Sequence, residues 1–235
     1  MPLAGGAREA TPDVFGFDFD ARPGDQPFPM TPALARAFRD HGYDFCVRYV
    51  PRRADAPSTR YDLKAEEADM LLDAGLALLA VQHFEGEGWK PSEALGTEYG
   101  DHAAEWALER IGFVGDVTIF CDIEGVAITT PEQRVIDYCH AWHASVLAAG
   151  FRPGAYLGSN ARIPDGEVTS VLPFEHYWAA FNETFAIPGR GLQMKQLAVG
   201  AKSPLRPKAA AGFRFQADRL QRDQADQIVR WFSRA

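Results

Sequence analysis

The sequence predicts an α/β fold: a closed (β/α)8 barrel of the TIM type, with short or missing helices in its later units. Short apolar runs alternate with longer segments of helical period almost from end to end, which is typical of βα units around a parallel sheet. Eight such runs fit into 235 residues that are 46% hydrophobic, which suits one domain spanning residues 1–235. No G-x-G-x-x-G follows the first run, which favours a closed barrel over an open dinucleotide-binding sheet.

Each apolar run has the length of a strand, and segments of helical period separate most of the runs. Residues 1–13 precede the first run and are expected to form an irregular tail. We expect strands at residues 14–21, 44–50, 76–84, 116–124, 153–159, 176–181, 192–198 and 213–219.

Helices are predicted between most of these strands. The segment TPALARAFRDHG, residues 31–42, starts with a Thr cap and a Pro and ends at Gly, which are common start and stop signals of a helix. Further helices are expected at 63–75, 99–112 and 131–150, each ending at Gly, and a last helix at 222–234. Little room for a helix remains at 160–175 and 182–191, and residues 198–212 are expected to be a loop.

Composition excludes several classes of partner. The net charge is −8 and no dense cluster of Lys and Arg occurs, so we expect no nucleic-acid partner. The longest apolar stretches are too short to cross a bilayer, and no signal peptide is visible, which leaves a cytoplasmic or an exported location open. The three cysteines, which lack metal-ligand spacing, are expected to be free apolar side chains: Cys46, Cys121 and Cys139.

Two pairs of acids stand where apolar residues would be expected. Asp18 and Asp20 end the first predicted strand, and Asp122 and Glu124 end the fourth. Residues two apart on a strand share a face, and the carboxyl ends of barrel strands meet at one mouth. We therefore expect these carboxylates to converge there, and their repulsion and burial to raise at least one pKa.

Such an acidic mouth suits glycoside hydrolysis, which needs one protonated carboxyl to donate to the leaving oxygen and another that is ionised. The plainer alternative is structural, since an acid pair can cap a helix or bind a basic group, and Arg48 is an obvious counter-ion. A metal site is not expected, because His140 and His143 lie on a predicted outer helix and no H-x-H occurs. We expect no cofactor.

Flat and polar side chains near the predicted strand ends complete the candidate site. Aromatic rings could contact the CH face of a sugar, and amides could bind its hydroxyls, although core packing accounts for such residues equally well. The aromatic residues are Phe84, Trp89, Tyr99, Tyr156, Trp178 and Phe181. The amides are Gln82, Asn182 and Gln196.

Several motifs together resemble a known family: FGFDFDARP, DFCVRYVPR, LLDAGLALLAVQHFE, YGDHAAEWA, IFCDIEG and GFRPGAYLGS. They are similar to the glycoside hydrolase-like domain of unknown function family 1906, which is related to the family 25 lysozymes (muramidases). The similarity covers nearly the whole chain and is strongest between residues 15 and 160. It implies a TIM-type barrel and a cell-wall or related polysaccharide as substrate.

The resemblance also implies roles for individual residues. Glu124 would be the acid catalyst, with Asp122, Asp18 and, on the last strand, Asp218 lining the site. The Y-H-F and W-Q-Y motifs of the lysozyme relatives appear here as residues 82–84 (Gln-His-Phe) and 195–197 (Lys-Gln-Leu), so substrate contacts differ.

The sequence thus leads to three hypotheses. The first is a monomeric glycoside hydrolase-like enzyme that acts on a β-linked glycan with Glu124 as general acid. Its substrate contacts would be Asp20, Arg48, Gln82, Phe84, Tyr156, Trp178 and Gln196. The second is a carbohydrate-binding or envelope-associated protein without catalysis, and the third is an acidic surface that docks a basic partner.

Overall fold

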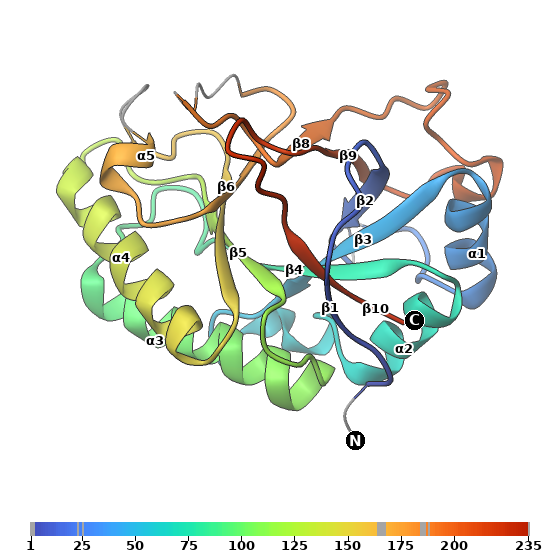
Figure 1. Ribbon diagram of the computed structural model, residues 1–235, viewed down its shortest axis with the longest axis horizontal. Coiled ribbons are helices and arrows are strands. Elements are labelled where there is room, and N and C mark those ends of the chain that lie inside the picture. The colour runs from blue at the N-terminus through green and yellow to red at the C-terminus, as the bar shows by residue number, and fades with distance from the viewer. Residues whose placement is uncertain are drawn as a thin grey trace.

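The computed structural model describes residues 3–22, 24, 26–163, 168–183, 187 and 189–234. Strands β2 to β9 lie at the eight expected positions and form one barrel (Figure 1). Their bounds are β2 Phe15–Phe19, β3 Tyr43–Val50, β4 Ala77–Gln82, β5 Thr118–Ile123, β6 Arg152–Leu157, β7 His176–Ala179, β8 Met194–Leu197 and β9 Gln216–Leu220.

The barrel is closed. Neighbouring strands are hydrogen-bonded in the order β4-β3-β2-β9-β8-β7-β6-β5, and β5 pairs again with β4. The closing register consists of Ala80 with Ile119, Val81 with Phe120, and Gln82 with Cys121. The predicted α/β barrel with short helices in its later units is confirmed.

Strand β9 departs from the all-parallel arrangement that a strict βα repeat would have. It runs antiparallel to both of its neighbours, β2 and β8. The reason lies in the connection from β8, where residues 198–212 form the expected loop and contain only the short 3-10 turn η3 (Lys208–Ala210). Without a crossover helix the chain re-enters the sheet at the rim where β8 ends. The start of β9 therefore lies at the mouth.

Four helices of ordinary length surround the first half of the barrel, with α3 and α4 side by side on one flank and α1 and α2 on the other (Figure 1). Thr31 caps α1, its side chain accepting the Leu34 N–H, as the sequence predicts. The bounds are α1 Pro32–Asp40, α2 Ala65–Asp73, α3 Glu93–Glu105, continued by the π-helical segment η2 Trp106–Ile111, and α4 Glu132–Ala148. The shorter elements are the 3-10 turn η1 Pro57–Arg60 and α5 Val168–Val171.

The two chain ends contradict two expectations. Instead of an irregular tail and a final helix, the chain forms β1 (Gly6–Glu9) and β10 (Arg230–Ser233), which pair antiparallel (Figure 1). Strand β10 also pairs with β4 at Leu78, below the point where β5 joins β4. A turn stops the expected helix, because the Asp223 carboxylate accepts the backbone N–H groups of Ala225 and Gln227.

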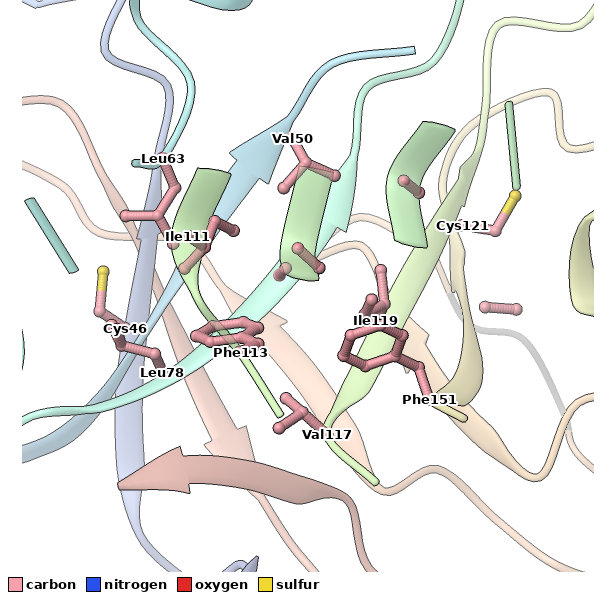
Figure 2. Close-up of a cluster of buried hydrophobic side chains, with 14 of the residues drawn as sticks. Cys46, Val50, Leu63, Leu78, Ile111, Phe113, Val117, Ile119, Cys121 and Phe151 are labelled. Atoms are coloured by element: carbon pink, nitrogen blue, oxygen red, sulfur yellow. The ribbon is translucent and has the colours of Figure 1, made fainter. Parts of the chain in front are cut away.

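Two apolar layers hold the barrel. One fills its interior, with Phe45, Val47, Leu79 and Phe120 among its members. The larger layer lies between strands and helices, and Figure 2 shows part of it, including Cys46 and Cys121 among aliphatic and aromatic side chains. All three cysteines are buried and free, as expected. Alternate residues of each strand thus face the interior, and the others face the outer layer.

Helices α3 and α4 approach each other closely at two glycines of α3. A Cβ atom on Gly96 would overlap the carbonyl oxygen of Tyr138, and one on Gly100 would lie 2.7 Å from the carbonyl oxygen of Trp142. The backbone of α3 therefore rests directly on α4, and this contact fixes the helix pair against β5. Glycine at these two positions serves packing rather than a turn.

Replacing Gly96 with Ala tests this close approach. At an exposed helix position the change would stabilise the protein by about 1 kcal/mol, since Ala is the better helix former. Here we expect Gly96→Ala to lower the free energy of unfolding by about 1–3 kcal/mol, because the added methyl forces the helices apart. Urea titration measures the change, with Thr97→Ala at the exposed neighbouring position as the control. Stabilisation by Gly96→Ala would contradict the packing described.

Candidate functional site

Four carboxyl groups form an acid cluster at the mouth of the barrel: Asp18 on β2, Asp122 on β5, Glu124 just after β5 and Asp218 on β9. The first, second and last are buried, with exposed fractions of 4%, 3% and 0%, whereas Glu124 is partly exposed. Asp18 faces the interior because its neighbours Phe17 and Phe19 pack in the outer layer. The structure thus brings together Asp18, Asp122 and Glu124, three of the four acids expected to converge, and adds Asp218, which the resemblance implied; the fourth, Asp20, lies in the loop after β2 and pairs with Arg22.

Asp18 is held by a short chain of hydrogen bonds. Its Oδ2 accepts the Gln196 side-chain N–H at 2.9 Å. The Gln196 Oε1 in turn accepts the Tyr156 hydroxyl at 3.3 Å and the Phe181 backbone N–H at 3.4 Å. Three strands of the barrel that are not adjacent, β2, β6 and β8, therefore contribute to the position of one carboxylate.

Asp218 lies beside Asp18 because of the antiparallel register, in which Gly16 of β2 and Gln196 of β8 both pair with it. Within the described part of the chain, neither of its carboxylate oxygens has a hydrogen-bond partner of ordinary geometry. Burial first, and then the negative charge of Asp18, raises the pKa of Asp218 well above its usual value. Burial with so few partners therefore favours the protonated form of Asp218.

Asp122 and Glu124 sit two residues apart where β5 ends. Oδ1 of Asp122 is buried and lacks a partner among the described residues. The backbone of Glu124 is fixed by the Trp89 indole N–H, which donates to its carbonyl oxygen at 2.7 Å. The Glu124 side chain lies against Gly158, the residue directly after β6. A Cβ atom at position 158 would overlap the Glu124 carboxylate. Gly158 therefore makes the space in which the Glu124 carboxylate sits.

Every member of the acid cluster has a raised pKa. Burial, partly offset by the hydrogen bond from Gln196 and by Asp218 and the charge of Arg48, brings the pKa of Asp18 to about 7. Burial and the charges of Glu87, Asp18 and Glu183 raise the pKa of Glu124 to about 7. For Asp122, burial and the charges of Glu124 and Asp18 raise the pKa well above its usual value. Near neutral pH the cluster therefore retains protons.

Two predicted substrate contacts are wrong, because their side chains face the outer layer and not the mouth. Arg48 is 0% exposed, pairs with Glu67 of α2 at 2.8 Å and donates to the Phe19 carbonyl oxygen at 2.9 Å. Gln82 is enclosed by the helices, donating to the Tyr99 carbonyl oxygen and accepting the Trp142 indole N–H at 2.7 Å. Strand alternation is the reason, since Val47 and Val81 occupy the inward positions next to them.

Of the remaining predicted contacts, Tyr156, Trp178 and Phe84 lie next to the acid cluster, whereas Asp20 lies in a loop. The rings of Tyr156 and Trp178 contact edge to face inside the barrel, with centroids 4.4 Å apart. Trp178 is 1% exposed and lies next to Asp218. The backbone N–H of Phe84 bonds Asp122. Asp20, by contrast, belongs to the loop after β2, where it accepts the Arg22 backbone N–H at 2.9 Å and pairs with its guanidinium.

The side chains of the other aromatic and amide candidates, Tyr99, Phe181 and Asn182, make no described hydrogen bond to the acid cluster, although the backbone N–H of Phe181 donates to Gln196. Tyr99 donates its hydroxyl to Glu85 on the outer side of the barrel. Phe181 and Asn182 are exposed in the loop after β7.

Sequence reasoning missed three side chains at the mouth. Tyr49 is the inward residue at the end of β3, two positions after Val47, so strand alternation could have identified it. Glu87 and Glu183 lie in loops, close enough for their charges to raise the pKa of Glu124. No periodic pattern marks a loop residue, and the sequence carries no signal for either glutamate.

The plainer explanation of the acids, pairing with basic groups, is not what the structure shows. Among the described residues, no Arg, Lys or His forms an ion pair with any member of the acid cluster. Nor do three His, Cys, Asp or Glu side chains anywhere in the described ranges group so that they could hold a metal ion.

Across the described residues, every helix is too short or too polar to cross a bilayer.

A separate cavity of about 750 Å³ lies outside the barrel wall, between the loops that follow β2 and β3. Phe28, Met30, Tyr61 and Glu67 are among its lining residues. No member of the acid cluster lines it, so we do not place the chemistry there.

Comparison with known proteins relates the chain to glycoside hydrolase-like domains. The family described as Rv2525c-like, glycoside hydrolase-like domain matches residues 36–210. This match confirms the resemblance predicted from the motifs. Comparison with the curated proteins gives no match.

Solved structures share the fold at low sequence identity. The Mycobacterium tuberculosis Tat-secreted protein Rv2525c, in complex with L-tartrate, is 17% identical over 93% of this chain and 98% of that chain, with a TM-score of 0.64. The Clostridium perfringens spore cortex lytic enzyme SleM is 14% identical over 90% of this chain and 68% of its own, with a TM-score of 0.60. The catalytic domain of endolysin ply40, from bacteriophage P40 of Listeria monocytogenes, is 15% identical over 90% and 95%, with a TM-score of 0.56.

The raised pKa of Asp218 predicts a pH-dependent effect of Asp218→Asn. A carboxyl whose pKa is raised by folding stabilises the protein fully below its unfolded pKa of about 3.8 and destabilises it progressively as the pH rises. Relative to the parent, we expect the variant to gain stability with pH, by up to about 1.4 kcal/mol per pH unit. Urea unfolding from about pH 4 to about pH 8 measures this. If the difference in free energy of unfolding between variant and parent stays constant over that range, Asp218 is ionised in the folded protein and its pKa is not raised.

Proposed function

Because the chain belongs to the Rv2525c-like, glycoside hydrolase-like domain family, we propose that it hydrolyses a β-linked glycan of the cell-wall type, with Glu124 as general acid. The observation that carries this proposal is the state of Glu124. It is partly exposed, so a substrate can reach it, and its pKa of about 7 leaves roughly half of it protonated at neutral pH, where an ordinary glutamate is ionised.

The neighbouring acids supply the other half of the chemistry. Hydrolysis of a glycosidic bond passes through a positively charged sugar, which carboxylates on one side of the ring stabilise. We assign this role to the ionised form of Asp122, since Asp122 shares the strand face of Glu124 and interacts with it electrostatically. Asp18 and Asp218 lie deeper and would position the sugar or the attacking water, with Gln196 orienting Asp18.

The type of glycan is proposed from two of the proteins with this fold. SleM is a spore cortex lytic enzyme, and ply40 is a phage endolysin. A peptidoglycan-like polymer is therefore the substrate to test first. The alternative of docking to a basic partner is disfavoured, because three of the four acids are buried and present little charged surface.

Glu124→Gln is the primary test of the proposed function. The amide keeps the shape of the side chain but cannot donate the proton, so we expect release of reducing ends to fall by about 100-fold or more. The assay incubates parent and variant with purified peptidoglycan and with chitin-type oligosaccharides, and mass spectrometry detects the products. Undiminished hydrolysis would reject Glu124 as the acid. Retention of glycan by the parent protein without cleavage would favour the non-catalytic carbohydrate-binding alternative.

The pH profile gives an independent test. A general acid works only when protonated, so hydrolysis should decline as the pH rises through about 7. The charge of Glu87 helps to raise the pKa of Glu124, and Glu87→Gln should therefore move this decline to lower pH without abolishing activity. Rates measured across the pH range check the shift, with Glu98→Gln on an exposed face of α3 as the control. An unshifted profile in Glu87→Gln would show that Glu124 does not govern it.

A further inference from the structure

Tyr49 places a hydroxyl donor at the acid-lined mouth. It is the last inward-facing residue of β3 and is partly exposed, unlike the buried Val47 below it. Asp18, Asp122 and Glu124 all lie near enough for their charges, after burial, to raise the pKa of its phenol well above the usual value. The hydroxyl is therefore protonated at neutral pH.

No hydrogen bond within the described part of the chain uses the Tyr49 hydroxyl. This sets it apart from Tyr156, which donates to Gln196. A protonated hydroxyl that is open at a substrate mouth and has no internal partner is available to a ligand. Since carboxylates line the rest of the mouth, Tyr49 supplies a neutral donor to a sugar oxygen.

The ring of Tyr49 is held by a second pair of residues. Its ring is stacked on that of His83, with centroids 4.4 Å apart and planes 18° from parallel. His83 in turn is fixed through Nε2, which lies 2.7 Å from Oδ1 of Asp62. Both partners are buried, at 7% and 4% exposure.

The position of Asp62 is itself set by the backbone. The next residue, Leu63, donates its N–H to the Tyr49 carbonyl oxygen at 3.0 Å, and its own carbonyl oxygen accepts the Trp106 indole N–H at 2.8 Å. The chain after β3 thus returns to the end of β3 and places the Asp62 carboxylate behind His83. Neither Asp62 nor His83 touches the acid cluster through a described hydrogen bond.

We propose that Tyr49 binds the glycan by donating its hydroxyl to a sugar oxygen, and that His83 and Asp62 are positioning residues that hold the Tyr49 ring. This inference rests on the proposed function, because it concerns the same mouth and the same class of ligand. Tyr49 would thus provide the polar contact from β3 to the glycan, because the Arg48 side chain faces the outer layer.

The test uses glycan affinity, so it does not depend on turnover. In a Glu124→Gln background, which prevents cleavage, calorimetry measures binding of a soluble peptidoglycan oligosaccharide. Adding Tyr49→Phe should weaken binding about tenfold, the loss of one hydrogen bond. Tyr177→Phe removes a hydroxyl on β7 that is buried and has no partner among the described residues; it is the matched control and should leave affinity unchanged. Unchanged affinity in Tyr49→Phe would overturn the proposal.

Asp62 is tested by a double-mutant cycle. Asp62→Ala should weaken binding by a similar factor, and Asp62→Asn should restore it, because the amide oxygen still accepts from His83 Nε2. Combined with Tyr49→Phe, Asp62→Ala should add nothing further, since both changes remove the same contact. Additive losses would show that Asp62 acts independently of Tyr49.

Two outcomes separate this inference from the proposed function. If the Glu124→Gln protein binds no oligosaccharide at all, the proposed function fails. If it binds and Tyr49→Phe binds equally well, only the role of Tyr49 fails. Should Asp62→Ala not fold, the His83 ring resonances of Asp62→Asn and Tyr49→Leu decide the positioning role by NMR, because the ring current of a stacked Tyr49 shifts them and Leu has no ring. His83 resonances that do not change in Tyr49→Leu would contradict the stacking.

Discussion

Closure of the sheet between β4 and β5 is the constraint on which the site depends. Without those three residue pairs, β5 would be the free edge of the sheet, and Asp122 and Glu124 would face solvent rather than Asp18. Closure also forces alternate side chains inward on every strand, so polar residues at the strand ends have to share one mouth. The α3–α4 contact through Gly96 and Gly100 supports β5 from outside, and β10 fills the space below, where β4 and β5 diverge.

The acid cluster exists at a cost in stability. Burial raises the pKa of all four carboxyls, and the charges of other acids raise it further for Asp122, Glu124 and Asp218. The interior offers few hydrogen bonds to Asp122 and Asp218 in return. The apolar layers inside and outside the barrel offset this cost. An arrangement that destabilises the fold yet keeps protons available near neutral pH is what acid catalysis requires. The Asp62, His83 and Tyr49 arrangement extends the same mouth with a neutral donor.

Much of this could be predicted from the sequence, and the errors have physical causes. The eight strands and the four main helices follow from periodicity and caps, and the D-x-E and first-strand acids follow from strand alternation. The positions of Arg48 and Gln82 near strand ends predict that they lie at the mouth, but strand alternation places their side chains on the outer face, since Val47 and Val81 take the inward positions. The antiparallel β9 and the β1–β10 pair depend on long-range pairing and on the turn at Asp223, which no local pattern specifies. Glu87 and Glu183 reach the site only through the course of two loops.

The central claim is that closure of the barrel gathers these carboxyls in a poorly solvated mouth that holds protons at neutral pH. Carbon-13 NMR titration of the Asp and Glu side-chain carboxyls measures this directly, without a substrate. We expect the resonances of Asp18 and Glu124 to titrate near pH 7, and those of Asp122 and Asp218 well above the usual pKa range of an aspartate. Titration of all four near pH 4, as in an unfolded chain, would contradict the account.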